Sequence, residues 1–320
     1  MKLSMSLASV LLVILALPLL WVRPGGARPN EAQSSSSQSA IKTIYPTFTT
    51  IDVPGAGVTG VYGINSAGDM VGYYGANSNA PHTHGFMLKD GKFTQVDYPH
   101  AYATVAYGIN DAGLIVGLAE LRGGLAQEGF AYDGVTFRRF RDGSDTATRA
   151  LGINNRNDIV GGSGATIYGT KGFRMRNGHY ETINFPGQNV YAYAADINDL
   201  GEIVGYTLDG LYSDSYSYTA GQFQNFDVPS AIQTEASGIN DKSVVVGWYG
   251  VYAGCSCAFA EAQGQYFSFS YPGAAFTAAT AINNSGLVVG QYTFDYQTLH
   301  GFTANIASNL GLSEKPSSKE

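Results

Sequence analysis

The chain has 320 residues and a formal net charge of -7, and only 13% of its residues are charged. This balance, with no cluster of Lys or Arg, excludes a basic surface that could hold a nucleic-acid backbone. The 41 glycines and 22 tyrosines favour short strands joined by tight turns over helices.

The N-terminus is typical of a secretory signal. Lys2 precedes an apolar run over residues 7–22, and small residues follow up to Ala27, where we expect cleavage, so the signal covers residues 1–27. The alternative is an uncleaved membrane anchor, because the run is long for a signal. In either case we expect an exported protein that is secreted, periplasmic or held at the cell surface. Residues 28–46 are polar and predict a flexible linker.

A repeated segment follows, in which Gly-Ile-Asn precedes a small turn and an apolar Val-Gly. It occurs six times with a spacing of 42 to 45 residues, and in two copies Asp or Ala replaces the first glycine. This period is typical of four-stranded propeller blades. Because each repeat buries its faces only against its neighbours, the chain predicts one repeated domain over residues 47–304. The six asparagines are Asn65, Asn110, Asn154, Asn198, Asn240 and Asn283.

Each repeat predicts four strands, a to d. Small residues beside the isoleucine suit an innermost strand a, and the consecutive apolar residues after the turn suit a strand b that is buried on both faces. The asparagine predicts the turn between them, a type I turn whose fourth residue has positive φ, as with Gly68. Asn157 suits that fourth position in the third repeat. Ser243 suits it less well, so we expect a different turn or local strain there.

The copies of strand d predict how the domain closes. Only five copies follow the repeats, whereas residues 48–54 match residues 93–99 of the first repeat position for position. We therefore expect this N-terminal strand to complete the last blade, which otherwise ends with strand c near Phe302. The prediction is an all-β, closed six-bladed β-propeller of four-stranded antiparallel blades. Residues 305–320 predict a polar C-terminal tail.

These motifs resemble the bacterial HAF-repeat family of extracellular proteins. The resemblance covers about residues 47 to 304 and rests on three motifs: His84-Gly85-Phe86, Ile51-Asp52-Val53-Pro54 and the Gly-Ile-Asn segment. Other copies of the first two motifs depart from the pattern. The resemblance implies an exported repeat protein, but it brings no established reaction or ligand that could be assigned to particular residues.

Polar residues that recur in the repeats are expected to be structural. Asp52, Asp97 and their counterparts occupy equivalent positions and are expected to hydrogen-bond a neighbouring turn. His84 and His300 are expected to form hydrogen bonds between adjacent blades. The two cysteines, Cys255 and Cys257, leave three alternatives open, which are a local disulfide, free thiols, and a metal-binding or intermolecular role.

Residues that interrupt the repeat are better functional candidates. His82 and His84 lie on one face of a strand and could bind a metal if a third ligand approached. Asp196 replaces a strand-a glycine and is expected to face the central channel. Tyr74 and Tyr249 belong to a group of tyrosines on the loop-rich face, which carries the b–c and d–a connections, and Trp248 is the only tryptophan beyond the signal.

No sequence motif of a known enzyme class occurs, and no cofactor or metal is predicted. We therefore expect a non-catalytic propeller that binds a polysaccharide or a cell-surface protein through its loop-rich face. The ligand-binding candidates are Tyr74, His82, His84, Asp196, Trp248 and Tyr249. One alternative is a carbohydrate-active hydrolase or lyase that uses Asp196 or the two histidines, and another is a structural protein of the cell envelope.

Overall fold

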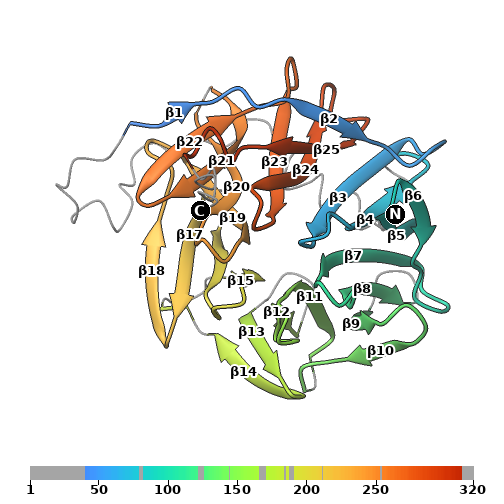
Figure 1. The fold of residues 1–320 in the computed structure, drawn as a ribbon. Helices are drawn as coiled ribbons and strands as arrows, with labels where there is room; N and C mark the ends of the chain where they lie inside the picture. The colour runs from blue at the N-terminus through green and yellow to red at the C-terminus, as the bar shows by residue number, and fades with distance from the viewer. Residues whose placement is uncertain are drawn as a thin grey trace, which may run out of the picture.

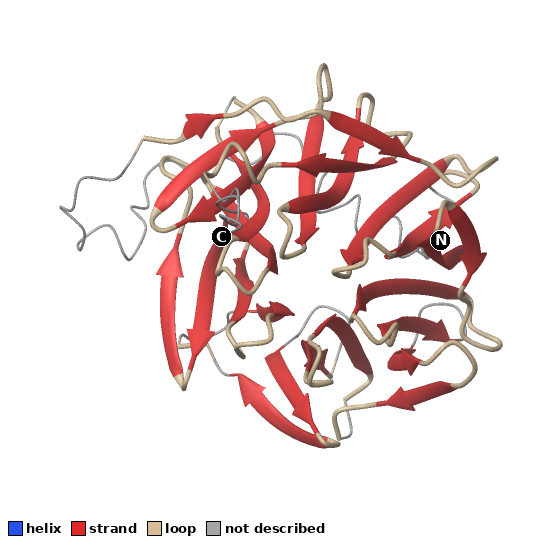
Figure 2. Cartoon of the chain, in the orientation of Figure 1, coloured by secondary structure: helices blue, strands red, loops and turns tan. Residues whose placement is uncertain are grey.

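The computed structural model describes residues 40–78, 82–121, 126–143, 145–165, 171–183, 185–186, 191–210, 212–252 and 254–311. The predicted signal and most of the predicted linker lie outside these residues. The described chain is all-β, and Figure 2 shows strands and loops without a helix. Among these residues there is no helix long and apolar enough to span a membrane.

The strands form six antiparallel units of four, arranged around a common centre (Figure 1). Unit 1 contains β3 (Val58–Ile64), β4 (Met70–Gly75), β5 (Thr83–Lys89) and β6 (Lys92–Gln95). Unit 2 contains β7 (Ala103–Ile109), β8 (Ile115–Leu121), β9 (Ala126–Tyr132) and β10 (Phe137–Phe140). Unit 3 contains β11 (Ala147–Ile153), β12 (Ile159–Gly164), β13 (Lys171–Arg176) and β14 (His179–Ile183).

Units 4 to 6 continue the same order. Unit 4 contains β15 (Tyr191–Ile197), β16 (Ile203–Asp209), β17 (Tyr212–Thr219) and β18 (Gln222–Phe226). Unit 5 contains β19 (Gln233–Ile239), β20 (Val245–Gly250), β21 (Ser256–Ala262) and β22 (Gln265–Phe269). Unit 6 contains β23 (Phe276–Ile282), β24 (Leu287–Thr293), β25 (His300–Asn305) and, from the front of the chain, β2 (Phe48–Ile51). The arrangement is propeller-like, with strand a of each unit innermost.

The N-terminal strand lies in the last unit, as the sequence predicts. β2 pairs antiparallel with β25, and Thr50 is opposite Phe302. Phe48 packs on the rings of Phe302 and Tyr271 with both centroid distances at 5.2 Å. Order also begins before residue 47, because β1 (Lys42–Thr43) pairs in parallel with β22 and Ile44 is buried. At the other end, Ile306 and Leu310 pack on the core of units 5 and 6, so the first residues of the predicted tail are held.

The core lies between adjacent units. Strand b contributes a fully buried valine in every unit, and strand c contributes a fully buried aromatic ring. The valines are Val71, Val116, Val160, Val204, Val246 and Val289; the rings are Phe86, Phe130, Phe173, Tyr216, Phe259 and Phe302. Gly72 shows why a glycine follows the valine, since a Cβ there would lie 2.0 Å from the main-chain oxygen of Gly60. The repeated Val-Gly pair therefore serves packing between strands.

Candidate functional site: a well ringed by asparagines

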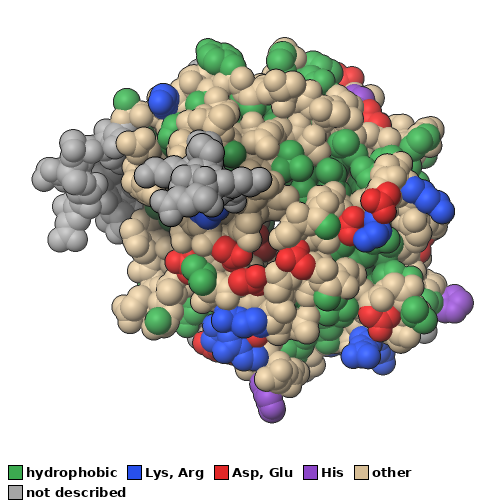
Figure 3. All heavy atoms as spheres, viewed as in Figure 1, with side chains coloured by type: hydrophobic (Ala, Val, Ile, Leu, Met, Phe, Trp, Pro, Cys, Tyr) green, Lys and Arg blue, Asp and Glu red, His purple; other side chains and the backbone are tan. Residues whose placement is uncertain are grey.

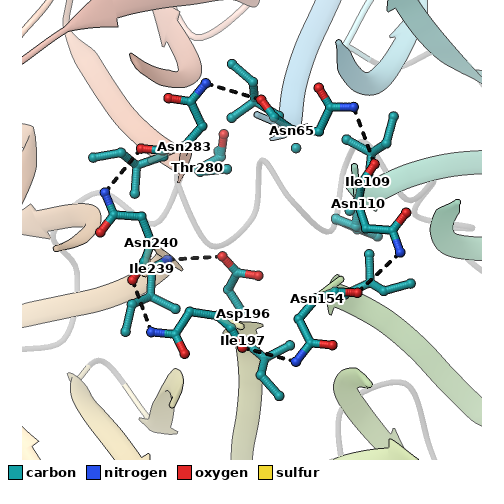
Figure 4. A pocket seen from close by; sticks show the side chains of 18 of the residues that line it. Asn65, Ile109, Asn110, Asn154, Asp196, Ile197, Ile239, Asn240, Thr280 and Asn283 are labelled. Atoms are coloured by element: carbon teal, nitrogen blue, oxygen red, sulfur yellow. Dashed lines mark hydrogen bonds between the residues drawn. The ribbon is translucent and has the colours of Figure 1, made fainter. Parts of the chain in front are cut away.

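The asparagine turns connect all six units through hydrogen bonds. Each asparagine Nδ2 donates to the main-chain oxygen of the asparagine in the next unit, over 3.0 to 3.3 Å, and Asn283 completes the ring by donating to Asn65 (Figure 4). Each Oδ1 also accepts the backbone N–H four residues ahead. The asparagine is thus a turn residue, as predicted, and a link between units, which was not predicted.

The turn has the same form where the sequence departs from the pattern. Asn157 and Ser243 both adopt positive φ, at 61° and 54°, in place of the glycine found elsewhere. Ser243 donates its N–H to the Asn240 oxygen over 3.0 Å, as Gly68 does to Asn65. Of the two alternatives expected at Ser243, a different turn is wrong and local strain is confirmed, because a residue that disfavours the left-handed conformation adopts it.

The residue after each asparagine forms a second, outer ring. In five of six junctions its backbone N–H donates to a side-chain oxygen of the equivalent residue in the next unit, over 2.7 to 2.9 Å. These acceptors are Asp111, Asn155, Asp199, Asp241 and Asn284. The sequence carries a signal for this ring, because the position is Asp or Asn in five repeats and Ser66 in the remaining one. Acidic side chains gather around the central hollow in Figure 3.

The two rings surround a well with a volume of about 180 Å³. The asparagines and the outer ring form its mouth, and strand-a residues of the units form its wall. Tyr62, Tyr107 and Tyr206 also line it. Tyr62 and Tyr107 precede their turn asparagines by three residues on strand a, and Tyr206 is opposite Tyr193 in strand a of unit 4, so these three rings lie at the inner end.

Asp196 faces this well, which confirms the prediction that it faces the channel (Figure 4). Its Oδ2 accepts the backbone N–H of Ile239 in the next unit over 3.0 Å. Burial raises the pKa of Asp196 to about 7; the N–H groups of Ile239 and Ile197 oppose this rise, and the charge of Asp241 adds to it. Gly152 makes room for the carboxyl group, because a Cβ at that position would lie 2.6 Å from Asp196 Oδ1.

Further buried polar groups lie in the interior beside the inner end of the well. Tyr62 Oη, Gln291 Oε1 and Glu235 Oε1 have no hydrogen-bond partner among the described residues. Burial raises the pKa of Tyr62 well above its usual value, and the nearby amide of Gln291 opposes that rise. Burial also raises the pKa of Glu235 to about 7, against the hydrogen bond from Trp248.

Two of the predicted ligand-binding residues are part of the core. Trp248 is 8% exposed, and its indole N–H donates to Glu235 Oε2 over 3.1 Å. Tyr249 is 6% exposed, and its hydroxyl lies 2.9 Å from Ser268 Oγ. Their placement on an accessible ligand surface is therefore wrong. Cys255 and Cys257, nearby in unit 5, form a disulfide with a Cα–Cα distance of 5.5 Å.

The other three candidates lie together on unit 1, away from Asp196. His82 is exposed and lies against Tyr102, with ring centroids 4.4 Å apart. His84 Nδ1 lies 2.6 Å from Asp97 Oδ2, and Tyr74 lies beside the His84 ring. Among the residues placed by the structure, no group of three His, Cys, Asp or Glu side chains could hold a metal ion.

The recurring histidines and aspartates form hydrogen bonds within a unit. His84 contacts Asp97 in unit 1, and His300 contacts Asp52 over 2.9 Å in unit 6. Asp97 also accepts the backbone N–H of Gly85 on strand c of its own unit. For these residues the expected bonds to adjacent blades and neighbouring turns are wrong, because strands c and d of one unit bring the side chains together. Asp142 is the exception, since it accepts the Ser163 hydroxyl of the next unit over 2.7 Å.

No protein-family model matches the sequence, and no curated protein matches it either. Solved structures with a similar arrangement include a gluconolactonase from Xanthomonas campestris, with 11% identity and a TM-score of 0.48 over 88% of this chain and 99% of that chain. The SapL1 lectin, in complex with alpha methyl fucoside, has 11% identity and a TM-score of 0.48 over 74% and 89%. The β-propeller domain of a protease from Pyrococcus furiosus has 9% identity and a TM-score of 0.41 over 78% and 96%.

Proposed function

We propose that the six units form a closed six-bladed β-propeller of an exported HAF-repeat protein. Two observations support closure. β2 completes unit 6 beside β25, and the asparagine hydrogen bonds run from each unit to the next until Asn283 reaches Asn65. Unit 6 also contacts unit 1 directly, because the Thr280 hydroxyl donates to the Val61 oxygen over 2.8 Å. Export remains a proposal from the predicted signal.

The function that this geometry supports best is non-catalytic binding of a polysaccharide, with one sugar-sized group of the polymer entering the well. The observation that carries this proposal is the well itself, a hollow of about 180 Å³ with asparagine and aspartate side chains at its mouth and isoleucine and tyrosine side chains in its wall. A cavity holds one water for each ~10–15 Å³ open to the centre of a water-sized sphere, so the well has room for several waters or for one small ring in their place. The loop-rich face becomes the less favoured location, since Trp248 and Tyr249 are buried.

A variant that fills the well tests this function. Ser237 lines the well at the position that Tyr62 and Tyr107 occupy in units 1 and 2, so Ser237→Tyr adds a ring that this fold already accommodates elsewhere. We expect the purified protein to bind one class of saccharide on a glycan array and the variant to lose that binding. Gln224→Tyr, on the exposed face of β18, is the matched control and should bind as the unchanged protein does. Equal binding by both variants would exclude the well as the site.

Asp196 supports a second candidate function, a carbohydrate-active hydrolase or lyase. A carboxyl group with a pKa of about 7 that faces a cavity is suited to general acid–base catalysis. Screening purified protein for release of reducing ends or unsaturated products from polysaccharides tests it. Activity that is lost in Asp196→Asn would replace the binding assignment with an enzymatic one.

A further inference from the structure

The charges that line the well are all negative. Asp196 lies in the wall, and three further carboxylates of the outer ring lie at the mouth, from Asp111, Asp199 and Asp241. No lysine, arginine or histidine is among the described residues that line the well. Carboxylates gathered around a partly enclosed space attract a cation more strongly than the same charges would in open water.

The hydrogen-bonding capacity that remains in the well is mostly that of acceptors. The Asn Nδ2 groups donate to main-chain oxygens, and the backbone N–H groups after five of the asparagines donate to the outer ring. The second oxygen of each outer-ring aspartate accepts a side-chain N–H from Asn155 or Asn284. A carboxylate has about four lone-pair sites, so these aspartates retain acceptor capacity after receiving both N–H groups. A ligand rich in N–H or O–H donors therefore fits the mouth better than an anion or an acceptor.

The inner end offers a second, independent indication of a ligand. The Tyr62 hydroxyl, which belongs to a residue lining the well, is buried without a hydrogen-bond partner among the described residues. The Gln291 side chain, which is 6% exposed, lies close enough to this hydroxyl to lower its pKa, and Gln291 Oε1 also has no hydrogen-bond partner among the described residues. Buried polar atoms without a partner are uncommon and costly, so they mark a place where a ligand or water supplies the missing bond.

We propose that the well recognises an amino sugar through its free ammonium group, with the carboxylates holding the charge and the sugar hydroxyls reaching the inner end. This assignment rests on the proposed saccharide-binding function and names its ligand class. An ammonium group supplies three donors and one positive charge, which complements an acceptor-rich, acidic mouth. The sugar ring accounts for the volume that a lone ammonium group would leave empty.

Three sugars that differ at one substituent test the assignment by calorimetric titration at about pH 7. Glucosamine carries the ammonium group, N-acetylglucosamine carries a neutral amide, and glucose carries a hydroxyl. We expect glucosamine to bind at least about tenfold more tightly than either neutral sugar, because a hydrogen bond to a charged group contributes about 1.5–3 kcal/mol and 1.4 kcal/mol is tenfold. Its affinity should also fall with added salt.

The possible outcomes distinguish the amino-sugar assignment from the proposed saccharide-binding function. Equal affinity for all three sugars overturns the ammonium assignment and leaves saccharide binding intact. Binding of ethylammonium as tightly as glucosamine overturns the amino-sugar assignment, because the cation alone then suffices. If no saccharide binds on the array or in the titration, both the amino-sugar assignment and the proposed function are wrong.

A matched pair of variants locates the ammonium group. Asp196→Asn removes a carboxyl group whose ionised form a bound ammonium group would favour, and it keeps an oxygen for the Ile239 N–H, so the fold should be retained. We expect it to weaken glucosamine binding about tenfold and to leave the melting temperature no lower. Asp209→Asn removes a carboxyl group at an exposed end of β16, outside the well, and should leave binding unchanged. Equal effects of the two variants would show that overall charge, and not the well, determines affinity.

Discussion

Replacing Phe48 with alanine should weaken the junction at which the front of the chain completes unit 6. The ring packs against Phe302 and Tyr271, each at 5.2 Å, and against Phe269 at 6.5 Å. A fully buried Phe→Ala change costs about 3–5 kcal/mol, and Phe48 is only partly buried, so we expect a loss of about 2–3 kcal/mol. At 2–4 °C per kcal/mol for a domain of this size, the melting temperature should fall by roughly 5–10 °C.

Thermal unfolding measures the loss, and amide hydrogen exchange shows where it acts. If β2 closes the ring, exchange in Phe48→Ala should rise first in β25 and in β3 of the adjoining unit 1. Tyr45→Ala is the control, since Tyr45 is an aromatic residue three positions earlier that is 88% exposed, and it should shift stability by less than about 0.5 kcal/mol. Equal stability of the two variants, or faster exchange spread evenly over all units, would refute closure by this strand.

Asn154→Ala removes the donor to the Asn198 oxygen and the acceptor of the turn N–H groups. The free energy of unfolding measured in urea should therefore fall by about 2–4 kcal/mol. An unchanged free energy would exclude a stabilising role for the asparagine ring. The Glu235 carboxyl has its pKa raised by burial from 4.5 to about 7, so its protonated form is favoured in the fold. The contribution of this protonated carboxyl to the free energy of unfolding is fully present below about pH 4.5. It is lost as the pH rises through about 7, an effect of up to roughly 3 kcal/mol. Unfolding compared at about pH 5 and 8 should therefore show a smaller loss in Glu235→Gln, and identical pH profiles would contradict this. Reducing the Cys255–Cys257 disulfide should cost less than about 2 kcal/mol, because the loop it closes is very short, and a collapse of the fold on reduction would disprove that estimate.

The repeat predicted the strands correctly because most interactions of the repeated residues are local. The glycine of strand b, the side-chain oxygen of the turn asparagine and the glycine at positive φ each contact a neighbour within the same hairpin. The hydrogen bond from one asparagine to the next, such as Asn110 to Asn154, depends on how closely two units approach, and no pattern within one repeat encodes that distance. Only the recurrence of Asp or Asn at the following position indicated a second partner.

The aromatic residues that interrupt the repeat were placed wrongly for a related reason. In strand b, neighbouring side chains point to opposite faces, and both faces are covered by other units. An aromatic ring at such a position fills space between units, as Trp248 does against Phe276 at 5.6 Å. An interruption of the repeat therefore indicates function only where its side chain reaches the channel, as that of Asp196 does.

This distinction also explains where the chain can vary without losing its fold. The turn asparagine occurs in all six units, because each one is both donor and acceptor for its neighbours and a single replacement would open the ring. The position three residues before each turn asparagine also lines the well, but its residue type varies between units. It is tyrosine in two units and leucine, alanine, serine or threonine in the others. No inter-unit packing rule requires a single residue type there. Side chains at this position can therefore set the shape of the well while making different contacts between units, as Thr280 does with Val61 and Tyr62 does with Tyr107. Such variation on a constant scaffold suits a binding site.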